Sequence, residues 1–110
     1  MISQRDIVLL PYPYTDFQGS KVRPAVVISN EAFNRKSDDC VMVPLTSILK
    51  NEPYSVFITQ ENLESGSLIK PSRIRADKIF SVTKKLIITK IGVLDERTFK
   101  KIKSELMTIF

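Results

Sequence analysis

The sequence predicts a mainly β fold, in which a small and strongly bent antiparallel sheet is closed by one carboxy-terminal helix. Short apolar or alternating runs recur through most of the chain, separated by prolines, glycines and polar residues, and such runs are typical of strands. Apolar residues recur at helical spacing only near the end of the chain, at Phe99, Ile102, Leu106 and Ile109. A length of 110 residues with 43% hydrophobic side chains suits a single domain over residues 1–110.

Six strands are expected before that helix. The segment 25–28 is apolar, rich in β-branched residues and too short for an independent helix, so it predicts a buried strand. In the segment 40–45, Val41, Val43 and Leu45 alternate with Cys40, Met42 and Pro44, as side chains on the two faces of a strand do. Loops are expected at 14–21 and 60–67, and a short turn or helical piece is expected around Phe33. The expected strands run over residues 7–12, 23–29, 40–45, 54–59, 72–79 and 86–91.

The carboxy-terminal helix has a clear start in the sequence. Asp95 is a good N-cap residue, and Leu94 and Phe99 occupy the two positions of a hydrophobic staple. Lysines at 100, 101 and 103 occupy the side away from the apolar stripe. We expect this helix to cover one end of the sheet.

The composition excludes several kinds of chemistry. Histidine is absent, which removes the commonest general acid–base and the commonest transition-metal ligand. Cys40 is the single cysteine, so we expect a small buried apolar residue and neither a disulfide nor a cysteine metal site. The acidic residues show no clustered spacing of the kind that holds magnesium. We therefore expect no cofactor and no metal, and any catalysis must use Arg, Lys, Asp, Glu, Tyr, Ser or Thr.

The sequence indicates a cytoplasmic protein without a membrane segment. Residues 1–6 carry charge where a secretory leader would need an apolar core. No apolar run approaches the length that spans a bilayer.

Charge is distributed unevenly along the chain. Residues 1–69 hold 6 basic and 8 acidic side chains, a balance of −2, whereas residues 70–110 hold 11 basic and 4 acidic side chains, a balance of +7. A basic half favours a polyanionic partner, either a nucleic acid or an acidic protein segment. The alternative is a solvated, lysine-rich surface.

Arg23 is the first candidate site residue. Pro24 restricts Arg23 to an extended backbone, and the buried run 25–28 follows directly, so a long cationic side chain is rooted on a rigid element. Such a side chain can grip an anion, although contact with a surface carboxylate is the ordinary alternative. Thr46 and Ser47 stand where an expected strand ends, and their hydroxyls can donate to a phosphate. A serine/threonine turn is the alternative for this pair.

Five stretches, taken in order, resemble the PemK/MazF toxins of bacterial toxin–antitoxin systems. No stretch is diagnostic by itself, but the order and spacing suit nearly the whole chain. The stretches are DIVLLPYPYTD at 6–16, RPAVVISN at 23–30, VPLTS at 43–47, RIRADKI at 73–79 and KIGVLD at 90–95.

The resemblance implies an SH3-like barrel of the MazF/PemK/CcdB type with a carboxy-terminal helix. It implies a sequence-specific, metal-independent endoribonuclease, an mRNA interferase, which cleaves single-stranded RNA to 2′,3′-cyclic phosphate and 5′-hydroxyl ends. The family's catalytic arginine and threonine carry over to Arg23 and Thr46: Arg23 would stabilise charge on the scissile phosphate, and Thr46 would donate a hydrogen bond to it. The RNA-binding residues expected from the same comparison are Asp16, Gln18, Ser20, Lys21, Ser47, Lys70, Ser72, Arg73 and Arg75.

The general base is left open by two departures from the family pattern. Some relatives carry an acidic residue where this chain has Ser72, and some carry histidine or glutamate in the loop that is shorter here, at 16–21. Asp16 and Asp77 are candidate carboxylates. A turn position for Asp16 and a salt bridge from Asp77 to Arg75 are the alternatives.

The resemblance also implies partners. We expect a homodimer, inhibited by a cognate antitoxin with an acidic carboxy-terminal segment, and contact with operator DNA only through the antitoxin complex. Two other functions are compatible with the same fold. One is a non-enzymatic toxin that poisons DNA gyrase, and the other is a catalytically silent barrel that binds nucleic acid.

Overall fold

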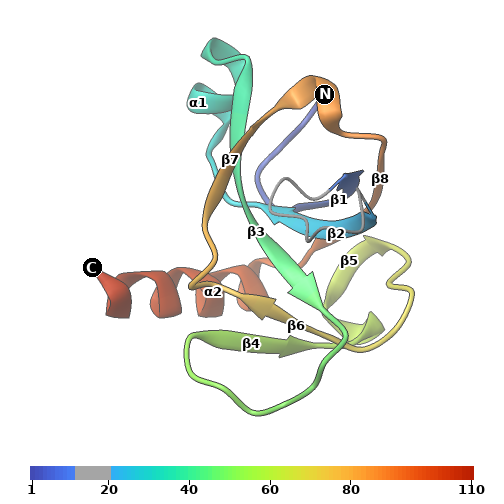
Figure 1. Cartoon of the computed structure of the whole chain (residues 1–110), viewed down its shortest axis with the longest axis vertical. Helices are drawn as coiled ribbons and strands as arrows, with labels where there is room; N and C mark the ends of the chain where they lie inside the picture. The colour runs from blue at the N-terminus through green and yellow to red at the C-terminus, as the bar shows by residue number, and fades with distance from the viewer. Residues whose placement is uncertain (12–20) are drawn as a thin grey trace.

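Within the residues that the computed structural model describes, 1–11 and 21–110, the chain forms a curved antiparallel sheet with a long helix at its carboxyl end (Figure 1). The predicted fold class, mainly β with a carboxy-terminal helix, is confirmed. Except for Lys21, the loop expected at 14–21 lies outside the described residues, and so does Tyr12 at the end of the first expected strand.

β3 (Asp39–Thr46) is the strand around which the other strands are arranged (Figure 1). Along one edge it pairs with β2 (Val22–Val27). Along its other edge, the first half of β3 pairs with β7 (Phe80–Thr83), and its last two residues pair with β6 (Ser72–Arg75). β3 thus belongs to both parts of the bent sheet. Its last residue is Thr46, which pairs with β6.

The other strands extend the sheet on both sides of β3. Among the described residues the strand order is β4-β6-β3-β2-β1-β8-β5, with β7 beside β3, and every pairing in this part of the chain is antiparallel. These remaining strands are β1 (Asp6–Pro11), β4 (Ser55–Ile58), β5 (Leu63–Gly66) and β8 (Thr89–Leu94).

The alternation of side chains along β1, β2 and β3 fills two hydrophobic clusters, one on each face of these strands. Both faces are therefore buried, which explains the nearly continuous apolar runs in the sequence. The first cluster lies toward the carboxy-terminal helix and contains Ile7, Val26, Val43, Leu45, Val56, Ile58, Ile74, Leu94, Phe99 and Ile102. The second cluster contains Val8, Leu10, Ala25, Val27, Cys40, Met42, Phe80 and Val82.

α2 (Glu96–Ile109) closes the first cluster. Asp95 caps the helix, because its Oδ1 accepts a hydrogen bond of 2.7 Å from the backbone N–H of Thr98. Phe99 and Ile102 are buried in the cluster, and α2 packs against β4. The predicted N-cap and the predicted covering role are confirmed.

α1 (Glu31–Lys36) confirms the helical piece expected around Phe33. Asn30 caps it through a hydrogen bond of 2.9 Å from the Phe33 N–H to Asn30 Oδ1. The prediction for Cys40 is also confirmed, since this thiol is fully buried in the second cluster.

The loop expected at 60–67 is wrong. This segment holds a short 3₁₀ helix, Gln60–Asn62, followed by β5, which pairs with β8. β5 is a polar edge strand without apolar alternation, so its sequence carries no strand signal. The pairing depends on a close approach at Gly66, where φ is +86° and an added Cβ would lie 2.2 Å from the Ile91 carbonyl oxygen.

The single strand expected at 72–79 is also wrong. β6 stops at Arg75, a turn closes with a 3.2 Å hydrogen bond from the Lys78 N–H to the Arg75 carbonyl, and β7 begins at Phe80. Two short strands arise here because each pairs with a different half of β3. The last expected strand is displaced as well: a 3₁₀ helix occupies Lys84–Leu86, and β8 follows it.

Candidate active site

Arg23 and Thr46 lie on neighbouring strands and line the same two hollows. β2 and β3 pair from Ala25 opposite Pro44 to Val27 opposite Met42. Arg23 and Thr46 each lie two residues beyond the Ala25–Pro44 pair, and residues two apart on a strand share a face. Directly opposed residues of an antiparallel pair direct their side chains to the same face. Two residues that are distant in the sequence thereby reach one surface.

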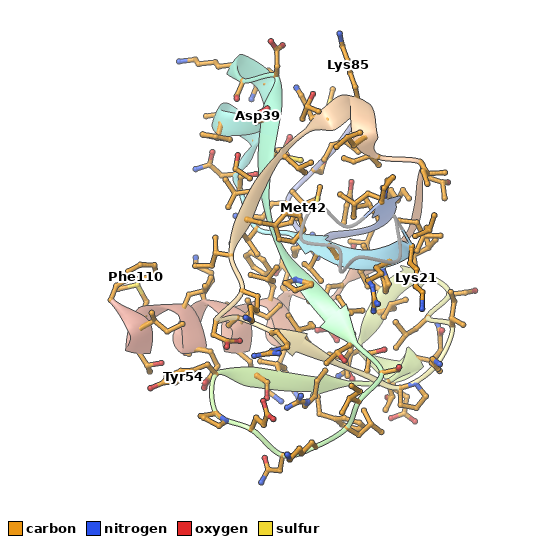
Figure 2. The ribbon with its side chains drawn as sticks, in the orientation of Figure 1. Lys21, Asp39, Met42, Tyr54, Lys85 and Phe110 are labelled. Carbon is orange, nitrogen blue, oxygen red and sulfur yellow. The ribbon has the colours of Figure 1, made fainter. Side chains whose placement is uncertain are left out.

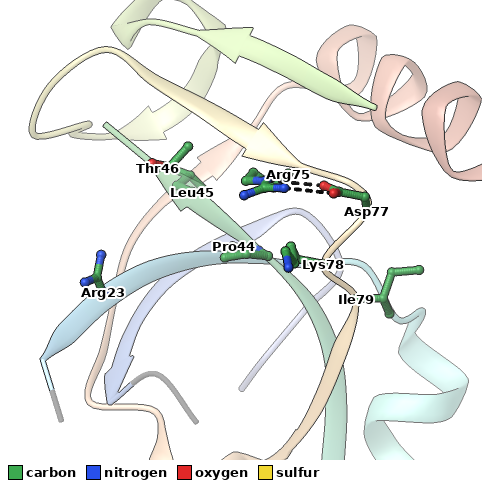
Figure 3. Close-up of a pocket in the computed structure, with 8 residues that line it drawn as sticks. All are labelled: Arg23, Pro44, Leu45, Thr46, Arg75, Asp77, Lys78 and Ile79. Atoms are coloured by element: carbon green, nitrogen blue, oxygen red, sulfur yellow. Dashed lines mark hydrogen bonds and ion pairs between the residues drawn. The ribbon is translucent and has the colours of Figure 1, made fainter. Parts of the chain in front are cut away.

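Two neighbouring hollows meet at this pair. Arg23, Leu45 and Thr46 line both hollows. Figure 3 shows the residues that line the larger one. The larger hollow has a volume of about 480 Å³, and its other lining residues are Pro44, Arg75, Asp77, Lys78 and Ile79. The smaller has a volume of about 120 Å³, and its other lining residues are Pro24, Ser47, Leu68, Ile69, Lys70, Ser72 and Ile91.

The Arg23 side chain is exposed at the edge of both hollows. No hydrogen bond or ion pair joins its guanidinium to another described residue. Three buried residues follow it on β2, with Ala25, Val26 and Val27 each 0–1% exposed, so the backbone that carries Arg23 is firmly held.

The Thr46 hydroxyl already has one partner. Its Oγ1 accepts a hydrogen bond of 3.2 Å from the backbone N–H of Ile48. A hydroxyl has one proton to donate, and this bond uses a lone pair and not that proton. Thr46 therefore keeps its O–H available for an acceptor such as a phosphate oxygen.

Arg75 and Asp77 form a charged pair in the larger hollow. Arg75 Nη2 lies 2.8 Å from Asp77 Oδ2, and Nε lies 3.3 Å from Oδ1, as the dashed lines in Figure 3 mark. Both side chains are about 30% exposed. The salt bridge to Arg75, which was the alternative interpretation of Asp77, is thus present. Lys78 adds a second cation to the lining of this hollow.

The smaller hollow is largely apolar, with hydroxyls and one cation at its edge. Lys70 and Ser47 are exposed. Ser72 is 5% exposed, and its hydroxyl donates a hydrogen bond of 3.0 Å to the Lys70 carbonyl. Ser72 is thus bonded locally and contributes no charge to this hollow.

Arg73 lines neither hollow. It is 5% exposed, and its guanidinium donates to the Ile48 carbonyl from Nε at 3.2 Å and to Ser55 Oγ from Nη1 at 3.3 Å. The loop between β3 and β4 covers it. Arg73 and Arg75 share one face of β6, because residues two apart on a strand do so, but only Arg75 lines a hollow.

Groups that could hold a metal ion are not found in the part of the chain that the structure describes: no three Asp, Glu or Cys side chains come together there. A search of the same residues finds no helix long and apolar enough to cross a membrane.

Comparison with protein families identifies the chain. Residues 3–110 match the family described as the PemK-like, MazF-like toxin of type II toxin–antitoxin systems. The chain belongs to this toxin family. The recognition made from the five sequence stretches is therefore confirmed.

Solved structures confirm a MazF-like fold, an antiparallel β half-barrel with a carboxy-terminal helix. An endoribonuclease in complex with its cognate antitoxin from a mycobacterial species is 24% identical, with a TM-score of 0.79 over 98% of this chain and 93% of that one. The crystal structure of MazE–MazF from Deinococcus radiodurans matches with 20% identity and a TM-score of 0.79, over 98% and 94% of the two chains. Mycobacterium tuberculosis toxin MazF-mt6 is 16% identical, with a TM-score of 0.76 over 94% of each chain. A search of curated proteins found no match.

The structure brings six of the residues expected from the toxin family to the two hollows: Arg23, Thr46, Ser47, Lys70, Ser72 and Arg75. Lys21 is exposed and lines neither hollow. Asp16, Gln18 and Ser20 lie outside the described residues.

Sequence reasoning missed the apolar walls and one cation. Leu68 and Ile69 come from a loop and Ile91 from within β8, and none of them carries a pattern that would mark it as a site residue. Lys78 could have been found, because it lies within the 73–79 stretch that resembles the family.

Proposed function

We propose that this toxin is a metal-independent, sequence-specific endoribonuclease that cleaves single-stranded RNA, messenger RNA included, at Arg23 and Thr46. The observation that carries the proposal is that this pair lines both hollows. An RNA strand that passes from one hollow to the other then has a phosphate at the two donors and a nucleotide on either side.

RNA supplies its own nucleophile, the 2′-hydroxyl. Its oxygen attacks the neighbouring phosphorus, the bond to the 5′-oxygen breaks, and the products carry a 2′,3′-cyclic phosphate and a 5′-hydroxyl. The enzyme must hold the two reacting groups in line and stabilise the crowded, charged phosphorane. The planar Arg23 guanidinium can donate to two phosphate oxygens at once, and the Thr46 O–H donates a further hydrogen bond.

Two protons move in this reaction. One leaves the 2′-hydroxyl, and one reaches the departing 5′-oxygen. Arg23 suits the second role better than the first, because a guanidinium holds its proton far above neutral pH. Asp77 is the described carboxylate at the larger hollow, and its bond to Arg75 holds it in a fixed place. We leave the base between Asp77 and Asp16.

Inhibition by an antitoxin fits the same surface. The mycobacterial relative and the Deinococcus MazF were crystallised with their antitoxins. We propose that an acidic carboxy-terminal segment of this toxin's antitoxin occupies the hollows around Arg23, Lys70 and Lys78, and that the toxin acts as a homodimer that contacts operator DNA through the antitoxin complex.

Purified, antitoxin-free protein incubated with a long single-stranded RNA in excess EDTA tests the activity. We expect discrete cuts with 5′-hydroxyl ends from the wild type and no cuts from Arg23→Ala. Arg35→Ala is the matched control, because Arg35 is an exposed arginine on α1, away from both hollows.

Cleavage by Arg23→Ala at the wild-type rate would make Arg23 structural and would overturn the site. The absence of cuts from a folded wild-type sample would overturn the nuclease, and a DNA gyrase cleavage assay would then separate a gyrase poison from a silent nucleic-acid-binding barrel.

A further inference from the structure

We propose that Arg73 is a positioning residue, which fixes the direction of the Thr46 hydroxyl through the backbone of Ile48. This positioning role replaces the role of RNA contact that the sequence predicted for Arg73. The catalytic part of the proposal rests on the proposed function, whereas the structural part concerns the loop between β3 and β4 alone.

A short path of hydrogen bonds joins the two residues. Arg73 Nε donates to the Ile48 carbonyl at 3.2 Å, and the Ile48 N–H donates to Thr46 Oγ1 at 3.2 Å. Arg73 is also the direct partner of Thr46 in the pairing of β6 with β3. One arginine therefore holds the residue whose amide determines which way the Thr46 hydroxyl is oriented.

Arg73 holds both ends of the same loop. Its Nη1 donates to Ser55 Oγ at 3.3 Å, and Ser55 Oγ donates to the Glu52 carbonyl at 2.7 Å. The loop between β3 and β4 carries exposed apolar side chains, with Ile48 66% exposed, so burial of its own side chains does little to hold it. The guanidinium supplies the contacts that burial does not.

The surroundings of Arg73 argue against direct contact with RNA. Its side chain is 95% covered and lines neither hollow, and no carboxylate of the described residues lies within ion-pair distance. Burying an unpaired charge is costly. The hydrogen bonds that the planar guanidinium donates to the Ile48 carbonyl and to Ser55 Oγ offset part of this cost.

Hydrogen exchange at the Ile48 amide tests the structural part without any assay of activity. We expect the amide to exchange at least about 10-fold faster in Arg73→Met than in the wild type, because its bond to Thr46 then opens more often. Arg35→Met, which makes the same chemical change on α1, should leave the rate unchanged. An unchanged Ile48 rate in Arg73→Met would overturn the proposal, whatever the RNA assay shows.

A double-substitution cycle tests the catalytic part. We expect Arg73→Met to lower kcat about 10- to 100-fold with little change in KM, as misplaced catalytic groups do. In a Thr46→Val background the same substitution should lower kcat less than about 3-fold, because the hydroxyl that Arg73 positions is already gone. Full additivity of the two effects would overturn the link to Thr46.

If Arg73→Met does not fold, Arg73→Lys is the variant on which both readouts are measured. A lysine keeps the charge but has no planar fork to hold Ile48 and Ser55 together, so we expect a smaller change in both readouts. Binding of a 2′-O-methyl RNA, which lacks the nucleophile, should keep its salt dependence in both variants. A drop of about 0.7 in the slope of log K against log salt would make Arg73 a phosphate contact and overturn the proposal.

Discussion

At the scale of single residues, the candidate site depends on where each side chain is rooted and on which of its atoms are already bonded. Arg23 stands near the exposed end of β2, and only Pro24 separates it from three buried residues. Thr46 has its oxygen bonded to a backbone amide and its proton free. Position and bonding together make both side chains suitable donors to one phosphate.

Substitution of Thr46 tests the role of the hydroxyl. We expect Thr46→Val to lower kcat about 100-fold with little change in KM, because one preorganised donor to the transition state is lost. Thr46→Ser keeps the hydroxyl and is the matched control, with an expected kcat within about 10-fold of the wild type. Equal activity of Thr46→Val and Thr46→Ser in single-turnover RNA cleavage would remove the hydroxyl from the mechanism.

Cys40 gives a prediction about reactivity. Burial raises the pKa of its thiol to about 11, although nearby Lys84 acts to lower it and Asp39 adds to the rise. The thiolate is the reactive form, so we expect alkylation at pH 8 to be very slow in the folded protein and fast in urea. Because the pKa is higher in the folded state, this thiol favours folding below about pH 9, and that contribution disappears as the pH rises toward 11. Rapid alkylation of the native protein, followed by mass spectrometry, would contradict the burial.

At the scale of elements, the cap of α2 shows how a local signal and a buried contact support one another. Asp95 accepts the Thr98 N–H, and Phe99 then enters the first cluster. Burial acts to raise the pKa of Asp95, but hydrogen bonds from the Thr98 side chain and backbone, together with Arg97 and Lys101, hold the pKa below its usual value.

The free energy of unfolding should therefore depend on pH through the carboxyl group of Asp95. We expect Asp95→Ala to lower the free energy of unfolding by about 1 kcal/mol at pH 7. The charged form of Asp95 favours folding, so its contribution is present above about pH 4 and is lost as the pH falls through the lowered pKa. Asp95→Asn keeps a capping oxygen without the charge and should lose less at pH 7, with a weaker acid dependence. Urea titrations at several pH values measure both effects, and equal acid dependence in wild type and Asp95→Asn would contradict the assignment.

At the scale of the whole molecule, the positive charge of the second half of the chain does not gather in one place. Lys70, Arg75 and Lys78 reach the hollows. Lys85 lies at the other end of the molecule, near Asp39 (Figure 2), and the lysines of α2 are exposed along the helix. The charge balance of a chain segment thus indicates a polyanionic partner without locating its site.

Salt dependence measures how many of these cations contact RNA. Arg23, Lys70, Arg75 and Lys78 line the hollows, so we expect the slope of log K against log salt to be about −3 for a 2′-O-methyl RNA. Lys78→Met should reduce the slope by about 0.7, whereas Lys103→Met, a control on α2, should leave it unchanged. Binding that does not respond to salt would contradict phosphate contacts at the hollows.

The sequence was informative where a signal is local. Three local patterns each predict their element from a few residues: the apolar run of β2, the alternation of β3 and the cap of α2. β5 was missed because it is a polar edge strand, and the break after Arg75 was missed because it depends on which half of β3 each following strand meets. Arg73 and Arg75 have the same local pattern, yet Arg73 is buried and bonded to a loop distant in the sequence, whereas Arg75 is partly exposed and lines a hollow.

By itself, the sequence determined the family and the fold class, and it predicted Arg23 and Thr46 as the two donors, because these depend on residue identity, local order and spacing. The tertiary structure decided which cations line the hollows and which are buried away from them. That distinction depends on long-range pairing of β3 with β2 and β6 and on the loop that buries Arg73, and contacts between distant segments leave no trace in the periodicity of either one.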